Sequence, residues 1–458
     1  MKFFNDDKEI FSASAPGRLD VMGGIADYSG SLVLQLPIAE KLTVQIQERD
    51  DSIISIQSFL KKDRLKFEFN YSTIQNKKPG EAGKIVRAMP GGNWATYVIG
   101  CLSVLESEKN IPFRGMNIEI QSKIPLGKGV ASSAALEVAT INAISRFYGI
   151  HLPEIELPLL AQQVENIFVG AACGLMDQLT VHLGQKNKLL PIICQPGKIF
   201  PSLAVPKGIQ FSGIDSGVKH AVGSSAYSEV RAATFMAFTM IANLEGVYPE
   251  QLLGVKSKNN FQLLPYGGYL ANIPVSEFEK KYATHLPGKI SGREFIERYK
   301  TSIDGVTQVN EGKNYDLLNC ARHPVYENHR VNMFQQLLLQ FSKSREKEKI
   351  LELLGELMLQ SHESYNAVGL GHLATDNIVE SVRKAGPASG VYGARVTGGG
   401  SGGTVVVLSF GKQGKQTVKE IFDQYKKRCE KRIYFFKGSE NGAQFLNQQI
   451  KHHDYIDV

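Results

Sequence analysis

The sequence predicts an α+β fold of two domains. The chain has 458 residues, 43% of them hydrophobic and 21% charged, which suits a globular protein of two or three domains. Segments that alternate apolar and polar residues, as half-buried strands do, are interspersed with longer segments of helical period. Between Gln195 and Pro206, three prolines and a loop-like composition mark a boundary. We therefore expect one domain over residues 1–202 and a second over residues 203–458.

The predicted elements follow in chain order. Strands are expected at residues 41–49, 116–124 and 404–410, and residues 209–217 are expected to form a strand that runs into a turn. Helices are expected at 132–148, 157–168, 330–355 and 357–362, with a shorter helix carrying Asp177. Ser132 or Ser133 is expected to cap the first helix, and Gly149 to end it. The run at residues 342–349 alternates in charge and predicts a solvated turn or a helix start.

Composition and charge exclude several classes of protein. The net charge of +7 is mild, and no basic run is interleaved with aromatic residues, so nucleic acid is not an expected partner; the charge favours an anionic substrate. The five cysteines are scattered without a C-x-x-C pair, which indicates reduced thiols and no zinc site. The first residues lack the apolar run of a signal peptide, and no stretch approaches the length of a membrane span. A cytoplasmic protein without a membrane partner is expected.

Two glycine-bearing loops lie in the first third of the chain. "GRLDVMGGIADYSGS", from Gly17 to Ser31, places four glycines around Arg18 and Asp27, and glycine lets a main chain approach another group closely. "IPLGKGVASSAALEVA", from Ile124 to Ala139, lies between a strand and a helix whose first N–H groups can bind an anion.

In the second loop, Gly127 and Gly129 flank Lys128, which adds positive charge, and the hydroxyls of Ser132 and Ser133 can bind phosphate or magnesium. The Gly-Lys-Ser/Thr ending of a Walker A loop is missing. The alternative is a tight turn capped by serine.

A third glycine-rich loop lies near the C-terminus. In "VTGGGSGGTVVVL", the residues Gly398, Gly400 and Gly403 match a dinucleotide-binding string. A strand follows the glycines where a dinucleotide site needs a helix, so nicotinamide binding is rejected. The alternative is that these glycines have only a structural role, in which they lead into the strand and let it approach other backbone closely.

One acidic residue follows the glycine of "CGLMDQLT". Asp177 lies just after Gly174 in the first turn of the short helix, where the helix dipole stabilises a carboxylate. An Asp at such a position usually only caps a helix. Glu165 lies twelve residues earlier, on the preceding helix.

The order of these motifs resembles the GHMP small-molecule kinases, and most closely their galactokinase-like members. The resemblance extends to "NWATYVIG", "DSGVKHAVGSSAYSEVR", "ARHPVYEN" and "MLQSHESYN", which spreads it over nearly the whole chain. Within this group the sequence is most similar to the kinase portion of the plant-type L-arabinokinases. The resemblance implies a ribosomal-protein-S5-like N-terminal domain, a ferredoxin-like C-terminal domain, and an active site between them.

Residue roles follow from the resemblance by position. It implies a catalytic pair, Asp177 and Arg18. The implied sugar-binding residues are Asp27, Gly24, Ile25, Gly174 and Tyr227. The implied ATP-binding residues are Trp94, Tyr97, Gly127, Lys128, Gly129, Ser132, Ser133, Gly399 and Gly400. Ser133 and Glu165 are the implied magnesium ligands. One departure is Ala131, where galactokinases usually have a third serine.

A second departure concerns the sugar. Galactokinases typically read Gly-Glu-His-x-Asp-Tyr where this chain has Gly23, Gly24, Ile25, Ala26, Asp27 and Tyr28, and in that family the Glu and His help to bind the hydroxymethyl group of galactose. L-Arabinopyranose has the ring stereochemistry of galactose without that group. The missing acidic side chain at Gly24 therefore predicts a pocket for the pentose. The alternative is that Gly24 only relaxes a turn while another residue binds the hydroxymethyl.

The expected activity is that of an ATP- and Mg²⁺-dependent sugar 1-kinase, which converts L-arabinose to L-arabinose 1-phosphate. A galactokinase or another sugar 1-kinase is the alternative within the class. A non-catalytic sensor that binds ATP and sugar is the alternative outside it. The oligomeric state is left open, with a monomer favoured.

Overall fold

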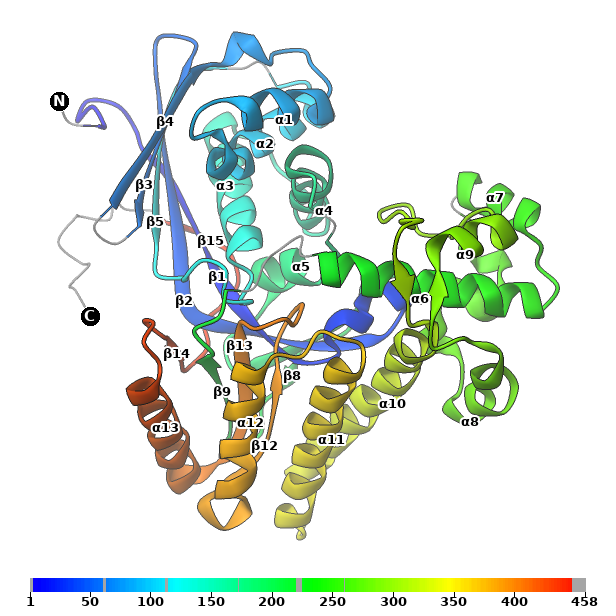
Figure 1. Cartoon of the computed structure of the whole chain (residues 1–458). Coiled ribbons are helices and arrows are strands. Elements are labelled where there is room, and N and C mark those ends of the chain that lie inside the picture. Colours follow the sequence, from blue (N-terminus) through cyan, green and yellow to red (C-terminus); the bar gives the residue numbers. More distant parts are fainter. Residues whose placement is uncertain are drawn as a thin grey trace.

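The computed structural model describes residues 3–60, 63–111, 114–171, 173–219, 225–258 and 260–446. In this part of the chain, helices pack on a large N-terminal sheet and on a smaller C-terminal sheet, and a helical region lies beside both (Figure 1). The predicted α+β class is confirmed.

The N-terminal sheet is built around two long strands, β1 and β2, which pair antiparallel. The strand order is β15-β1-β2-β5-β3-β4, and β6 pairs with β2, β7 and β8. The described strands are β1 (Phe11–Met22), β2 (Leu32–Glu48), β3 (Ile53–Leu60), β4 (Asp63–Asn70), β5 (Met116–Ser122), β6 (Lys188–Ile193), β7 (Lys198–Ile199), β8 (Leu203–Ala204) and β15 (Gln444–Leu446). The predicted strands at 41–49 and 116–124 thus become parts of β2 and β5.

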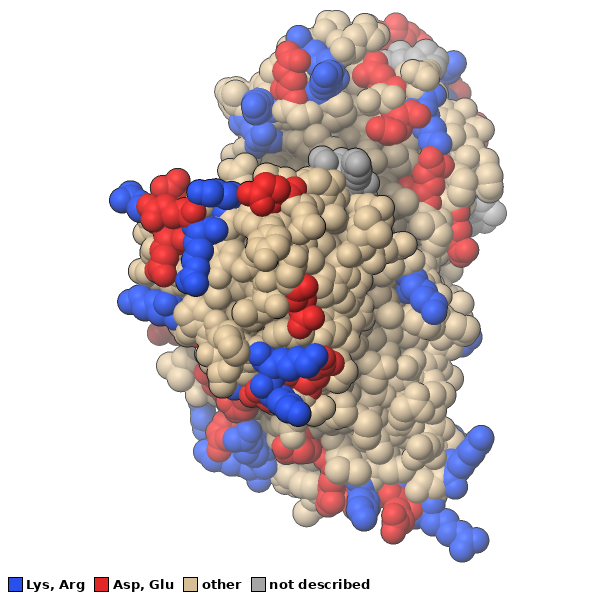
Figure 2. All heavy atoms as spheres, turned by 90° about the vertical axis from the view of Figure 1, so that its right-hand side faces the viewer, with Lys and Arg blue, Asp and Glu red and all other residues tan. Residues whose placement is uncertain are grey.

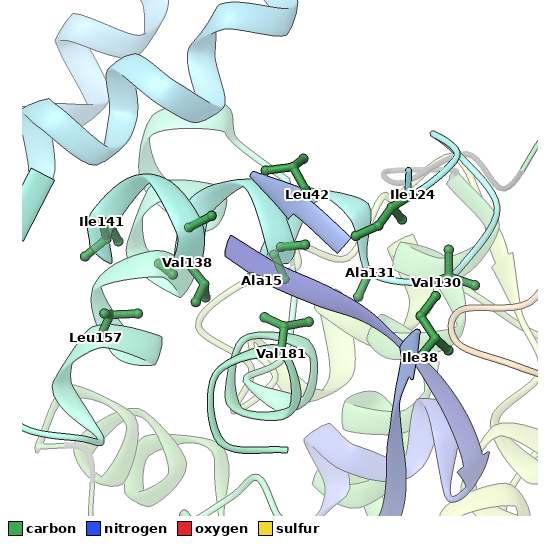
Figure 3. Close-up of a cluster of buried hydrophobic side chains, with 14 of the residues drawn as sticks. Ala15, Ile38, Leu42, Ile124, Val130, Ala131, Val138, Ile141, Leu157 and Val181 are labelled. Carbon is green, nitrogen blue, oxygen red and sulfur yellow. The ribbon is translucent and has the colours of Figure 1, made fainter. Parts of the chain in front are cut away.

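Five helices cover one face of this sheet (Figure 1). They are α1 (Pro79–Ala88), α2 (Gly92–Lys109), α3 (Ser132–Tyr148), α4 (Glu156–Gln163) and α5 (Met176–Leu183), and a π-helical segment, η3 (Val164–Val169), continues α4. α3 packs directly on β1 and β2. Its apolar residues Val138 and Ile141 are fully buried, and they join side chains from β1, β2, α4 and α5 in one core (Figure 3).

The C-terminal sheet has the order β12-β13-β9-β14, and all of its pairs are antiparallel. Its strands are β9 (Ile209–Asp215), β12 (Val391–Val396), β13 (Thr404–Phe410) and β14 (Phe435–Phe436), and the helices packed with it are α11 (Lys347–Ala367), α12 (Leu373–Ala385) and α13 (Gly411–Arg428). The chain runs strand, helices, strand, strand, helix, strand, which is the ferredoxin-like order. The predicted arrangement of this domain is confirmed.

The remaining helices form a region with its own apolar core. They are α6 (Ser225–Leu244), α7 (Pro249–Lys258), α8 (Val275–Glu277), α9 (Gly292–Tyr299) and α10 (Leu317–Phe341), with a small hairpin of β10 (Ile290–Ser291) and β11 (Asn314–Tyr315). α6 and α10 pack against each other. A short 3-10 helix of the N-terminal domain, η1 (Gly24–Ser29), contributes Ile25 and Tyr28 to this core. The first glycine-rich loop is therefore held between the domains.

The last part of the described chain also joins the two sheets. β14 pairs with β9, after which β15 pairs with β1 in the N-terminal sheet. The division of the chain at residue 202 stays a prediction. No helix among the described residues is both long and apolar enough to cross a bilayer.

Two local predictions were wrong. The helix expected over residues 330–355 is interrupted, because α10 ends at Phe341 and α11 begins at Lys347; the charge-alternating run between them is the predicted turn and helix start. The N-cap of α3 is Ala131, whose φ of 59° is left-handed, and no side chain caps the helix. Ser132 and Ser133 therefore lie in the first turn of α3, with their hydroxyls free of a capping role.

Charge is not gathered by sign on the face shown in Figure 2. Lysines and arginines there lie interspersed with aspartates and glutamates, and large neutral areas separate them (Figure 2). This face offers no extended basic stripe of the kind that tracks a nucleic-acid backbone.

Candidate active site

A cavity lies where the three glycine-bearing loops meet. Its lining residues are Arg18, Gly24, Ile25, Asp27, Gly127, Gly129, Ala131, Ser132, Ser133, Glu165, Cys173, Gly174, Met176, Asp177, Tyr227, Gly398 and Gly399. Segments that are hundreds of residues apart in the sequence therefore line the same cavity.

Arg18 and Asp177 form a two-point ion pair in this wall. Arg18 Nε and Nη2 each donate to a carboxylate oxygen of Asp177 at 2.9 Å, and Arg18 Nη1 donates to the carbonyl of Gly129 at 2.6 Å. The Arg18 side chain is 4% exposed and that of Asp177 is 28% exposed. The carboxylate is therefore fixed in direction but still reachable from the cavity, which suits a group that must contact a substrate.

Local backbone geometry brings Arg18 to this position. The pairing of β1 with β2 shifts register between Pro16 and Arg18, and such a bulge redirects a side chain. A Cβ on Gly17 would lie 2.6 Å from the carbonyl oxygen of Val130, and this same carbonyl accepts the backbone N–H of Arg18 at 3.0 Å. Glycine at position 17 thus lets β1 touch the second glycine-bearing loop.

Asp27 lies in η1 and is almost fully buried, with 4% exposure. Its Oδ1 accepts the N–H of Tyr28 at 2.8 Å. Burial raises the pKa of Asp27 to about 7, although the nearby Arg231 opposes this shift. A Cβ on Gly174 would lie only 2.1 Å from Asp27 Oδ2, so glycine at position 174 is required for this carboxyl to reach the cavity wall.

The raised pKa of Asp27 predicts a specific pH dependence of stability. Between the ordinary Asp value near 4 and about 7, the folded state holds a proton that the unfolded state has released, so stability falls as pH rises through this window. We expect the free energy of unfolding of the native chain, relative to Asp27→Asn, to drop on the order of 4 kcal/mol from pH 4 to pH 7 and then stay level. Denaturant titrations across pH measure this difference.

A matched control is Asp50→Asn, because the Asp50 side chain is 90% exposed. Its unfolding free energy is expected to follow that of the native chain across the same pH range. A native-minus-Asp27→Asn difference that stays flat below pH 7 would contradict the burial of an ionisable Asp27.

The second loop presents a helix N-terminus to the cavity. Gly127 and Gly129 have φ values of 68° and 69°, and Ile124 and Val130 beside them are 1% exposed, which anchors the loop in the N-terminal core (Figure 3). The first N–H groups of α3 have no helical partner, and the helix dipole favours negative charge there. Ser132 and Ser133 add two hydroxyls, so this wall suits a phosphate group.

Glu165 lies beside Ser133 on the π-helical segment η3. Its carboxyl is hydrogen-bonded to the Ser133 hydroxyl and accepts from Gln178 Nε2 at 3.0 Å. Burial and the nearby Asp177 raise the pKa of Glu165 to about 7. One hydroxyl and one carboxylate oxygen are ligands that Mg²⁺ accepts, with water and phosphate oxygens completing its shell. Across the described ranges, no cluster of three or more His, Cys, Asp or Glu residues could hold a metal by itself.

Four predicted nucleotide-site residues do not line this cavity. The ammonium of Lys128 is instead 3.0 Å from the buried Asp215 carboxylate, so its charge is already partnered across the two domains. Trp94 and Tyr97 are half-buried on α2, and Gly400 packs against Leu370. Contact of Trp94, Tyr97 and Gly400 with a nucleotide stays a prediction.

The space beside Gly24 is taken up by two side chains, those of Tyr365 and Arg395. A Cβ on Gly24 would lie 1.6 Å from the hydroxyl oxygen of Tyr365 and 2.9 Å from Arg395 Nη2. The space beside Gly24 is therefore filled, and no acidic side chain fits there. Tyr365 and Arg395 were missed, although Tyr365 lies within the stretch "MLQSHESYN", because nothing local to either residue tells that it lies beside Gly24. Cys173, which was also missed, is next to Gly174 and could have been found from that adjacency.

Comparisons with known proteins agree with this arrangement. Residues 96–185 match the family described as GHMP kinases N terminal domain, and residues 347–431 match GHMP kinases C terminal. The chain is 37% identical to an L-arabinokinase from Arabidopsis thaliana over 96% of its own length, and it spans 46% of the length of that protein. It is 27% identical to a galactokinase from Chloroflexus aggregans, over 86% of this chain and 83% of the relative.

Solved structures share the fold. Lactococcus lactis galactokinase complexed with galactose superimposes with a TM-score of 0.72 at 23% identity, over 97% of both chains. Methanococcus jannaschii mevalonate kinase superimposes with a TM-score of 0.56 at 18% identity, over 95% of this chain and all of that one.

Proposed function

Because the chain belongs to the GHMP kinase family, we propose that it is an ATP-dependent sugar 1-kinase acting on L-arabinose. The observation that carries the proposal is the Arg18–Asp177 pair, which lies in one cavity with a helix N-terminus and a buried carboxyl, Asp27. An anion site, a reachable carboxylate and a polar subsite for hydroxyl groups are what phosphoryl transfer to a sugar requires.

The phosphates of ATP would lie on the first turn of α3, against the N–H groups and hydroxyls of Ser132 and Ser133. The anomeric hydroxyl of the sugar would face Asp177, whose carboxylate accepts the proton as the sugar oxygen bonds to the γ-phosphorus and ADP leaves. Arg18 holds the carboxylate in direction and offsets negative charge on the transferring group. Positioning and electrostatics supply most of the rate enhancement in such reactions.

Ser133 and Glu165 would hold Mg²⁺ together with oxygens of the nucleotide, since their oxygen donors lie side by side in the cavity wall. When bound, the ion neutralises charge on the phosphates. Glu165 lies beside Asp177, so a cation there also lowers the repulsion between the two carboxyls.

The sugar preference is proposed from the wall formed by Gly24 and Ile25. Ile25 is apolar, and the side-chain direction of residue 24 is closed by Tyr365. A hydroxymethyl group that is buried there without a partner costs about 1–3 kcal/mol, or roughly ten- to a hundred-fold in kcat/KM. The pentose lacks this group and avoids the cost. The galactokinase relatives make D-galactose the rival substrate.

The test is a substrate panel with the purified chain, ATP and Mg²⁺. ADP release is followed with L-arabinose, D-galactose, L-fucose and D-glucuronate, and loss of the reducing end identifies phosphorylation at C1. We expect kcat/KM for L-arabinose to exceed that for D-galactose by about tenfold or more. A larger kcat/KM for D-galactose would make the protein a galactokinase, and binding of both ligands without ADP release would make it a sensor. The cytoplasmic location and the monomeric state stay predictions.

A further inference from the structure

Tyr365 lies behind the cavity wall and connects two of its loops. It is on α11, fully buried, and does not itself line the cavity. Its hydroxyl accepts the backbone N–H of Ile25 at 2.9 Å and donates to the carbonyl of Gly398 at 2.8 Å. Ile25 and Gly398 both line the cavity, from the N-terminal and C-terminal domains respectively. One hydroxyl group thus links two cavity-lining segments that come from different domains.

The same hydroxyl occupies the side-chain position of residue 24. Gly24 has a φ of 39°, and a Cβ built on it would be 1.6 Å from the oxygen of Tyr365 and 2.7 Å from its Cζ. Contacts below 3.0 Å are not found for real Cβ atoms. Gly24 and Tyr365 are therefore complementary, because the tyrosine can lie there only if residue 24 has no side chain.

A buried ion pair holds this arrangement in place. The guanidinium of Arg395 lies over the ring of Tyr365 at 5.1 Å and is 2.8 Å from the Asp20 carboxylate, and both charged side chains are 0% exposed. Asp20 Oδ1 in turn accepts the N–H of Gly24 at 3.2 Å. Gly24 of η1, Tyr365 of α11 and the ion pair between Asp20 of β1 and Arg395 of β12 are therefore in mutual contact.

The third loop also contacts the catalytic pair. A Cβ on Gly398 would lie 3.1 Å from Arg18 Nη2 and 3.1 Å from the Gly129 carbonyl oxygen, so this loop is packed against the arginine. Displacement of Gly398 would therefore disturb Arg18, while displacement of Ile25 would disturb the subsite around Asp27.

We propose that Tyr365 is a positioning residue of the sugar subsite, which sets the shape of the wall at Gly24 and Ile25 and excludes a side chain from position 24. This inference rests on the proposed function in one respect, which is that the cavity binds a sugar. It does not depend on which sugar is bound.

The first test is Tyr365→Phe, which keeps the ring and removes both hydrogen bonds. We expect KM for the sugar to rise on the order of tenfold, and KM for ATP to change less than threefold, because the freed Ile25 N–H lies at the sugar wall. The matched control is Tyr71→Phe, since Tyr71 is also fully buried and its hydroxyl donates to Glu106 at 2.7 Å outside the cavity. This control should leave both KM values within twofold. The same result for Tyr365→Phe would overturn the proposal.

A double-mutant cycle tests the complementarity independently of turnover. Gly24→Ala is expected to lower Tm by several degrees in the native background, and by clearly less in the Tyr365→Ala background, where the methyl group has room. Part of the effect remains in both backgrounds, because a φ of 39° strains any L side chain. Equal Tm losses in the two backgrounds would refute the contact, even where Tyr365→Phe folds poorly.

The design separates this inference from the proposed function. If the native chain prefers another sugar, the KM comparison is made with that sugar. If it binds ATP and sugar without turnover, the two dissociation constants replace the two KM values, with the same expected ratios. If it binds no sugar at all, the role of Tyr365 as a sugar-site residue is refuted together with the proposed function, while the cycle still reports on the contact.

Discussion

Replacing Asp177 with Asn is expected to lower kcat for sugar phosphorylation on the order of a thousandfold or more, because the amide cannot accept the proton of the attacking hydroxyl. The substitution keeps the size and shape of the side chain, and one oxygen can still accept from Arg18. KM for both substrates and Tm should therefore stay close to those of the native chain. Steady-state kinetics and a thermal melt of the same preparation measure these quantities.

A matched control is available in the exposed turn between β2 and β3. Asp51 accepts two hydrogen bonds from Arg49, at 2.8 and 2.7 Å, in the same two-point geometry as Asp177 with Arg18. Asp51→Asn should leave kcat unchanged. If Asp177→Asn retained more than about a tenth of native turnover, Asp177 would act only in orientation and not as the proton acceptor.

Replacing Arg18 with Met is expected to lower kcat on the order of a hundred- to a thousandfold. The loss comes from three contacts: two donors to Asp177 and one to the Gly129 carbonyl. Without them the carboxylate is free to rotate, and charge on the transferring group is no longer offset. Methionine fills a similar volume, so the buried wall is retained.

The double variant decides whether the pair acts as one unit. Groups that work together show strongly non-additive losses, so Arg18→Met combined with Asp177→Asn should be about as slow as the slower single variant. Arg49→Met is the control for removal of an arginine from a two-point pair. Additive losses in the double variant would mean that Arg18 contributes independently of Asp177.

Much of this site was predictable from local sequence. Gly127, Gly129 and the following serines identify a helix start, which faces the cavity, and Asp177, three residues after Gly174, identifies a carboxylate in a first helical turn. Such features depend on a few consecutive residues, so no tertiary information is needed to recognise them. The strand predicted after the third glycine-rich loop is confirmed for the same reason, because β13 directly follows that loop.

Other features depend on residues far apart in the chain. Lys128 is an implied ATP-binding residue, and the sequence does not show that its ammonium pairs with Asp215 of the second domain; its contact with a nucleotide stays a prediction. The N-cap of α3 was expected to be a serine, but packing sets Ala131 in a left-handed conformation instead. Neither the ion pair of Lys128 nor the conformation of Ala131 can be recognised from a periodic pattern in the sequence.

Short stretches of sequence were enough to identify the loops that build the cavity and the charged side chains that they bring to it, because glycine content, helix starts and strand period are local features. What lies beside Gly24 followed only from the packing of the domains. There the hydroxyl of Tyr365 fills the space of a side chain, 341 positions further along the chain. The physical reason is that steric exclusion between two domains is set by their packing, and a glycine alone does not tell whether the space beside it is open or occupied.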